Sequence, residues 1–171
     1  IGNFAFGCCS ILEKIVLPAG LRETGICAFE HCEKLREIFI SEGVPRIGPF
    51  AFNDCVSLEK LTLPGTLREI GASAFAHCER LRELVVPEGV VKIGDMAFSG
   101  CKSLERVSLP DTLRELGARA FGECRSLKTA ELPAAWCGRR ERIAALKRAC
   151  LPYRVFVYRQ KENRRQQGRV L

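Results

Sequence analysis

The chain has 171 residues, 47% of them hydrophobic and 27% charged, a composition that excludes an intrinsically disordered protein and predicts a folded core. The sequence shows neither an apolar run of membrane-spanning length nor the basic and apolar blocks of a signal peptide. The net charge of +7 belongs to the end of the chain, because residues 138–171 contain 11 Lys and Arg against two acidic residues.

One motif recurs every 23 residues. The stretch "AFGCC" at 5–9 returns as "AFEHC" at 28–32, "AFNDC" at 51–55 and "AFAHC" at 74–78. The recurring residues are Phe6, Phe29, Phe52, Phe75, Phe98 and Phe121, and Cys9, Cys32, Cys55, Cys78, Cys101 and Cys124. A period of this length, with an L-x-x-I-x-L core, is typical of a solenoid whose coils bury their apolar sides by stacking.

Each coil contains one segment that alternates like a strand. In the first coil, Ile15 and Leu17 are predicted to point inward while Lys14 and Val16 point outward, and Pro18 ends the strand. The conserved-spacing glycines, such as Gly25 and Gly48, mark the bend into the return, where positive φ or close backbone approach is expected. The predicted fold is therefore an α/β repeat: short parallel strands on a concave face, joined by turns, 3₁₀ pieces or short helices.

Stacking at the spacing of paired strands, about 4.8 Å, turns equivalent positions into columns. We expect the phenylalanines to fill the core as one such column, with the cysteines as small apolar fillers beside them. Side chains that point the same way are poorly placed for a disulfide, so we expect the cysteine column to be reduced. Four cysteines lie outside this column: Cys8, Cys27, Cys137 and Cys150.

Six copies of I-G-x-x-A-F-x-x-C-x-x-L-x-x-I-x-L-P-x-x-L-x-x cover about 80% of the chain and resemble BspA-type leucine-rich repeats. The departures are small: Ser41 replaces a strand-ending proline, Thr24 replaces an opening isoleucine, and Ala130 weakens the sixth strand. The resemblance implies a curved right-handed solenoid used in binding and adhesion, often at cell surfaces. It provides no catalytic residues to carry over.

Two kinds of outward column follow the strands. Charges alternate in sign from coil to coil, as in Lys14, Glu37 and Lys60, which suits either a solvated face that assists register or a charged recognition stripe. The next column includes apolar residues that stacking does not need, and we predict that it contacts a partner. Its members are Val16, Phe39, Thr62, Val85 and Ser108, followed by Glu131.

The residues preceding the column cysteines include His31, Asp54 and His77, which could form a small transition-metal site or an Asp-oriented imidazole. Against this, the sequence has no C-x-x-C or H-x-x-x-H pair, and both histidines follow from a copied 46-residue unit. Catalytic motifs are also missing from the sequence. We therefore predict no metal, no cofactor and no enzymatic activity.

We divide the chain into six repeats (1–133), a C-terminal cap (134–158) and a basic, disordered tail (159–171). In the cap, Trp136, Ile143, Leu146 and Cys150 approximate one face of a helix over 138–150, which Pro152 ends. Residues 153–158 alternate as a seventh strand, with Tyr153 and Val155 opposite Ala130 and Leu132. No equivalent cap precedes Ile1, so we expect further coils upstream.

The leading hypothesis is a protein-binding module that uses its sheet face. The alternative is a binder of nucleic acid or of an anionic membrane surface through the tail, and a third possibility is a purely structural spacer. The tail residues concerned are Arg159, Lys161, Arg164, Arg165 and Arg169. The compartment stays open, because the family resemblance favours a cell surface whereas unpaired thiols favour a reducing environment.

Overall fold

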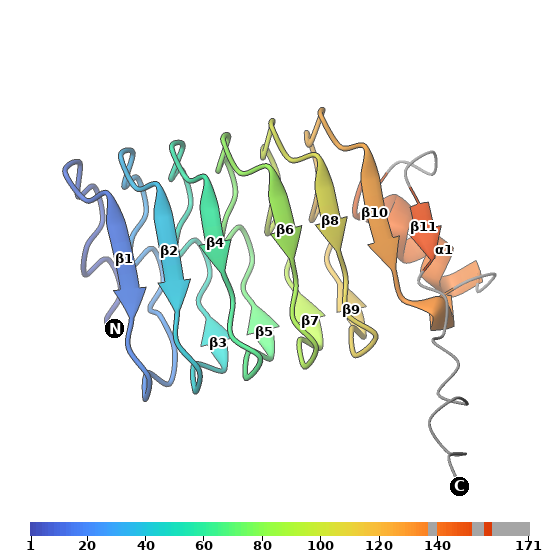
Figure 1. The fold of residues 1–171 in the computed structure, drawn as a ribbon, viewed down its shortest axis with the longest axis horizontal. Coiled ribbons are helices and arrows are strands. Elements are labelled where there is room, and N and C mark those ends of the chain that lie inside the picture. The colour runs from blue at the N-terminus through green and yellow to red at the C-terminus, as the bar shows by residue number, and fades with distance from the viewer. Residues whose placement is uncertain (137–139, 152–155, 159–171) are drawn as a thin grey trace, which may run out of the picture.

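The protein forms a solenoid of stacked coils, described by a computed structural model over residues 1–136, 140–151 and 156–158 (Figure 1). Each coil contributes one short strand to the outward face seen in Figure 1, and these strands run parallel. They are β1 (Lys14–Leu17), β2 (Glu37–Ile40), β4 (Lys60–Thr62), β6 (Glu83–Val85), β8 (Arg106–Ser108) and β10 (Thr129–Leu132). The predicted solenoid of parallel strands is confirmed.

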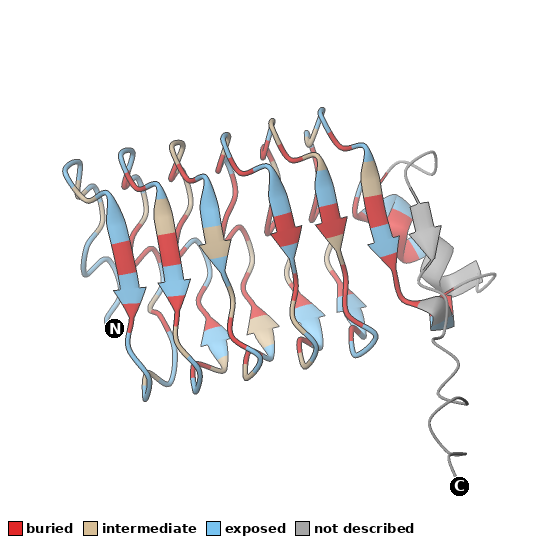
Figure 2. Cartoon of the chain, viewed as in Figure 1, coloured by how far each residue is buried: buried red, intermediate tan, exposed pale blue. Residues whose placement is uncertain are grey.

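Side chains alternate along these strands as expected. In β2, Ile38 and Ile40 are buried while Phe39 between them is 45% exposed, and β1 follows the same pattern (Figure 2). The register pairs residues 23 apart, for example Lys14 with Glu37 and Val16 with Phe39. Every outward column therefore runs along the solenoid axis.

A second parallel sheet lies on another side of the coils, and the sequence analysis missed it. Its strands are β3 (Arg46–Ile47), β5 (Glu69–Ile70), β7 (Lys92–Ile93) and β9 (Glu115–Leu116), paired in that order. Each has only two residues and is followed by glycine, so the Ile-Gly pair was interpreted as a bend alone. A strand this short gives no alternation to detect.

The phenylalanine column is the centre of the core. Neighbouring rings from Phe6 to Phe121 lie 5.1 to 5.6 Å apart between centroids and are parallel within 7°. Backbone hydrogen bonds hold the same spacing, since the N–H of Phe29 donates to the C=O of Ala51 at 2.8 Å and Phe52 donates to Ala74 at 2.8 Å. Within residues 1–133 the returns are built of turns, without the 3₁₀ or helical pieces that were also considered.

The cysteine column lies beside the rings, and its thiols donate to backbone carbonyls. Cys55 Sγ lies 3.4 Å from the C=O of Phe29, and Cys78 Sγ lies 3.5 Å from that of Phe52. Burial raises the pKa of the Cys78 thiol, so it stays protonated and can donate. The nine cysteines within the described residues are all free, as expected, and Cys137 lies outside those residues.

The glycine column is required by close approach and not by positive φ. A Cβ on Gly94 would lie 2.6 Å from the backbone nitrogen of Ala72 and 2.8 Å from the carbonyl carbon of Gly71. Gly25, Gly48, Gly71 and Gly117 show the same crowding against the preceding coil. Of the two expectations for these positions, close backbone approach is confirmed.

The last coil is covered by η1 (Ala134–Trp136), α1 (Arg140–Arg148) and β11 (Phe156–Tyr158). The end of α1 substitutes for a return, because Arg119 and Phe121 donate to the carbonyls of Arg148 and Ala149 at 2.6 and 3.0 Å. Trp136 and Leu146 join the core cluster. Neither described helix is long and apolar enough to cross a membrane.

Two details of the cap differ from the prediction. Cys150 is exposed and has a φ of 61°, while Ala149 beside it is buried, so the helical face was displaced by one residue. The strand β11 pairs Ala130 with Phe156 and Leu132 with Tyr158, an offset of three residues from the predicted register. The helical return has its own length, so the 23-residue step no longer applies there. Residues 152–155 lie outside the described residues.

The outward sheet is interrupted once among the residues described. The strands β1, β2 and β4 form one sheet, and β6, β8, β10 and β11 form another. The return segments and the second sheet continue across the same junction, where Asp54 donates to Ala76 at 2.9 Å and β5 pairs with β7. The solenoid is therefore continuous, with a split on one face between β4 and β6.

Replacing Gly94 with alanine should destabilise the fold by about 2 kcal/mol or more, because the new Cβ forces two coils apart. Urea unfolding followed by circular dichroism measures the change in free energy of unfolding. Gly2 is the matched control, since no atom lies within 4 Å of a Cβ built there. Gly2→Ala should change stability by less than about 0.5 kcal/mol. Equal effects of the two variants would contradict the close-approach explanation.

The column thiols should resist alkylation in the folded protein. With N-ethylmaleimide at pH 8, exposed Cys8 and Cys150 should react, while buried Cys78 and Cys101 react more than about a hundredfold slower, since they require opening of the fold. Peptide mass spectrometry at timed intervals measures each site, and urea-unfolded protein serves as the control in which all sites react. Comparable rates in the folded protein would show that the column is accessible.

Candidate functional site

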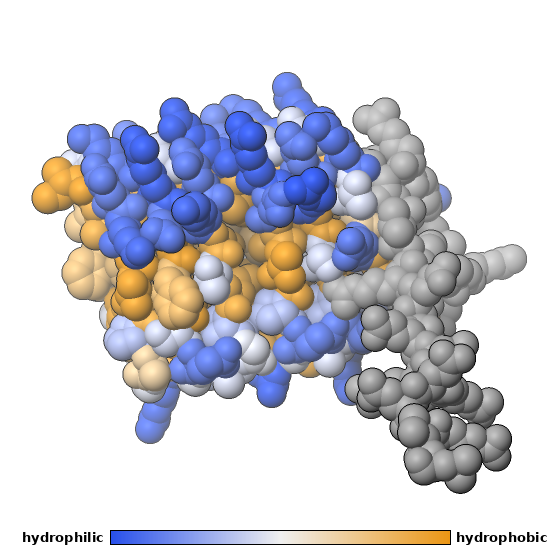
Figure 3. Space-filling view, in the orientation of Figure 1, coloured by the Kyte–Doolittle hydropathy of each residue, from blue (hydrophilic) through white to orange (hydrophobic). Residues whose placement is uncertain are grey.

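The predicted partner-binding residues form one row across the outward sheet. Val16 lies opposite Phe39, Phe39 opposite Thr62, and Val85 opposite Ser108. Val16 is 57% exposed, Phe39 45% and Val85 68%. Thr62 is also exposed and Ser108 half-buried. An apolar band accordingly crosses the strands in Figure 3.

A charged band runs beside this row, at the starts of the strands (Figure 3). Lys14 and Glu37 form an ion pair at 2.9 Å, Lys128 and Glu105 form another at 2.8 Å, and Arg106 pairs with Glu83. The hydrogen bond and charge of Lys14 lower the pKa of the Glu37 carboxyl. The predicted alternation of charge therefore brings opposite charges together between neighbouring coils.

A second charge ladder follows the second sheet. Glu69 lies 3.1 Å from Arg46 and 3.4 Å from Lys92, and Lys92 lies 3.8 Å from Glu115. A groove of 850 Å³ runs along these strands and reaches Arg148 of α1. Sequence reasoning missed this ladder, although Glu23, Arg46, Glu69, Lys92 and Glu115 are spaced 23 apart and alternate in sign. The charges in the groove therefore largely neutralise one another.

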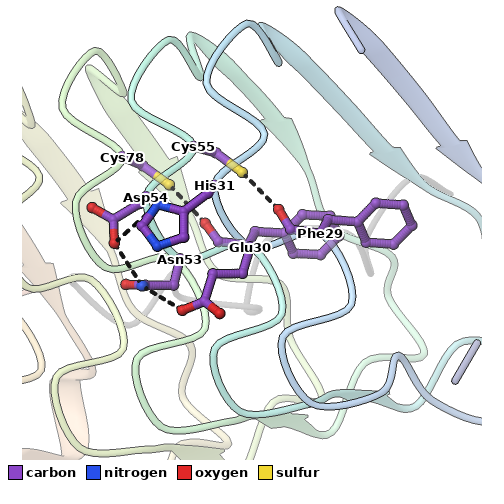
Figure 4. A network of polar contacts seen from close by, with 8 residues as sticks. Phe29, Glu30, His31, Asn53, Asp54, Cys55 and Cys78 are labelled. Carbon is purple, nitrogen blue, oxygen red and sulfur yellow. Dashed lines mark hydrogen bonds and ion pairs between the residues drawn. The ribbon is translucent and has the colours of Figure 1, made fainter. Parts of the chain in front are cut away.

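The histidine cluster is small. His31 Nδ1 lies 3.9 Å from Asp54 Oδ2, and the Asn53 side-chain amide donates to Asp54 at 2.7 Å and to Glu30 at 3.0 Å (Figure 4). His77 leans away from Asp54, since its ring occupies the space where a Cβ on Gly100 would lie. The two histidines therefore do not converge on Asp54. Among the described residues, no group of three His, Cys, Asp or Glu side chains is placed to hold a metal ion.

The basic residues of the alternative hypothesis, at 159–171, lie outside the described residues. The structure therefore gives no geometry for Arg159, Lys161, Arg164, Arg165 or Arg169. The described residues offer instead the row of outward apolar side chains and the charged band beside it.

The profile of the BspA type leucine rich repeat region matches residues 1–128 in six copies. This chain belongs to the BspA-type leucine-rich repeat family. Six stacked coils with a phenylalanine column and a buried cysteine column are thus the family's repeat as this chain builds it. A comparison with curated proteins finds no match.

Solved structures of leucine-rich repeat proteins share the fold. A leucine-rich repeat protein from Bacteroides ovatus is 43% identical, with a TM-score of 0.72, over 77% of this chain and 34% of its own. The leucine-rich repeat protein of T. pallidum is 29% identical, with a TM-score of 0.74, over 87% of this chain and 75% of its own. The pneumococcal vaccine antigen PcpA is 28% identical, with a TM-score of 0.65, over 70% and 30%. This BspA-type chain therefore spans about a third of the Bacteroides protein.

Replacing Lys14 with methionine should raise the pKa of Glu37 toward that of a free carboxyl, while the pKa of Glu105 should not change. Because the folded-state pKa of Glu37 is lowered, the Lys14–Glu37 pair stabilises this BspA-type fold above the ordinary carboxyl pKa. That contribution is lost as the pH falls through the folded-state pKa. An NMR titration of the side-chain carboxyls measures both groups. An unchanged pKa for Glu37 would show that Lys14 does not act on it.

Proposed function

We propose that the chain is a non-catalytic binding module whose outward sheet recognises a protein partner through Val16, Phe39, Thr62, Val85 and Ser108. Membership of the BspA-type family fits a non-catalytic repeat module. The observation that carries the proposal is the exposure of Phe39 and Val85 in one row on a rigid, paired sheet. The same row would also serve adhesion, if the partner is attached to a surface.

The exposed row supports binding because stacking does not require it. The inward residues Ile38 and Leu84 already fill the core, so the outward Phe39 and Val85 could be polar without loss of packing. A partner that covers these side chains removes apolar surface from water. The flanking ion pairs leave the row bordered by polar groups, as in protein interfaces with an apolar centre and a charged rim.

The test uses photo-crosslinking, since the partner is not identified beforehand. With p-benzoylphenylalanine in place of Phe39, light should capture a protein from serum or cell extract that mass spectrometry can name. The matched control carries the same analogue at Phe4, which is 65% exposed on a return segment and away from the sheet. A protein captured from Phe4 and not from Phe39 would contradict the proposal.

The captured protein is then purified and titrated against variants. Phe39→Asp combined with Val85→Asp should weaken binding by tenfold or more, a loss of about 1.4 kcal/mol. Ending the chain after Tyr158 should leave the affinity unchanged. Loss of binding on this truncation, with full affinity in the double variant, would favour the basic tail and refute the sheet face.

A further inference from the structure

The split between β4 and β6 leaves hydrogen-bonding groups of the strands without their usual partners. At neighbouring junctions, Lys60 donates to the C=O of Arg36 at 3.0 Å and Arg106 donates to that of Arg82 at 3.3 Å. The equivalent donor in the fourth coil is Glu83, and over residues 1–136 no backbone hydrogen bond links it to Glu59. Two strand edges therefore face each other unpaired.

Strand edges of this kind accept an added strand. A row of free N–H and C=O groups is a template for another extended chain, and main-chain hydrogen bonds supply much of the affinity. Leu61 on β4, and Glu83 and Val85 on β6, are the residues whose backbone would form this ladder in a continuous sheet. Leu61 and Leu63 are only half-buried, whereas their equivalents Ile38 and Ile40 are buried, so the split also uncovers apolar side chains.

The split is also basic. A pocket of 450 Å³ there is lined by one acidic residue and three cationic ones, together with Ser103. The residues that carry charge are Glu59, Lys60, Arg80 and Arg82. Arg80 lies 3.8 Å from Glu59, whereas Lys60 and Arg82 form no direct ion pair with a described residue. The pocket thus has an excess of positive charge that the rest of the ladder does not show.

We infer that the split between β4 and β6 receives an extended acidic segment of the partner protein. The backbone of that segment pairs with the strand edges, and its carboxylates contact Lys60, Arg80 and Arg82. This inference rests on the proposed function, since Thr62 and Val85 belong both to the split and to the apolar row. A helix could not satisfy two strand edges, whereas an extended chain can.

An inserted strand needs β4 and β6 to stand two strand spacings apart, about 9.6 Å. Only the outward face is unpaired at this junction, so the two halves of the solenoid can adjust by hinging at the second sheet, where β5 and β7 remain joined. The return segments also stay bonded across the junction, through Phe52 and Ala74. Binding can therefore separate the strands without breaking the solenoid.

Amide hydrogen exchange, followed by NMR, tests the split itself. In the free protein the amides of Glu83 and Val85 should exchange at least tenfold faster than those of Arg106 and Ser108, their equivalents 23 residues on. If all four are equally slow, the sheet is continuous in solution and the inference is overturned, while the proposed function stands.

Peptide binding tests the occupant. The probes are three fluorescein-labelled octapeptides: alternating Val-Glu, alternating Val-Lys, and Val-Glu with alternate backbone nitrogens methylated. We expect the first to bind, as measured by fluorescence anisotropy, and to slow exchange at Glu83 and Val85, and the other two to bind at least tenfold more weakly. Equal binding of the methylated peptide would show attraction by charge alone and would overturn strand addition.

Matched variants complete the experiment. Arg80→Glu with Arg82→Glu should weaken binding of the Val-Glu peptide by tenfold or more. Lys34→Glu with Arg36→Glu makes the same change at the same two positions two coils earlier, where the sheet is continuous, and should alter binding less than twofold. Equal losses in both double variants would overturn the inference. If the crosslinked partner still depends on Phe39 and Val85 in that case, the sheet-face function survives and only the acidic segment is refuted.

Discussion

The structure depends on the stacking of identical side chains at one strand spacing. Phenylalanine rings from Phe6 to Phe121 lie face to face at 5.1 to 5.6 Å, a distance that the parallel strands and the turn-to-turn hydrogen bonds share. Larger or smaller residues in the column would disturb the coils on both sides, because protein cores tolerate changes in volume poorly. The 23-residue period is thus a geometric constraint: a coil of another length would move every column out of line.

The same constraint shapes the surface. Once the inward columns are aligned, the outward ones are aligned too, so a single exposed residue type becomes a row and a single charge becomes a ladder. Glu37 beside Lys14 and Glu69 between Arg46 and Lys92 show how opposite charges follow from alternation. The exposed Phe39 and Val85 belong to such a row, which gives a partner an ordered surface without a cleft.

Sequence could predict what repeats, because periodicity states directly which residues share an environment. The inward Ile15 and Leu17, the phenylalanine column and the free thiols all follow from it. Features that belong to one place were not predictable in this way: the two-residue strands such as β3 are too short for a pattern, and the register of β11 depends on the length of a helical return. The candidate row was placed on the sheet correctly, but its role stays a prediction. The split between β4 and β6 has no signal that we can find in the sequence, since Leu61 and Val85 fit the repeat.

The alternation of charge sets a rule for how such an array can change its length. Deleting the third coil would bring Arg36 beside Arg82, Glu37 beside Glu83 and Arg46 beside Lys92, three repulsive contacts created at once. Removing or duplicating two coils together would leave every neighbour complementary. Recombination in the gene should therefore be tolerated best in steps of 46 residues, so that related arrays differ by even numbers of coils.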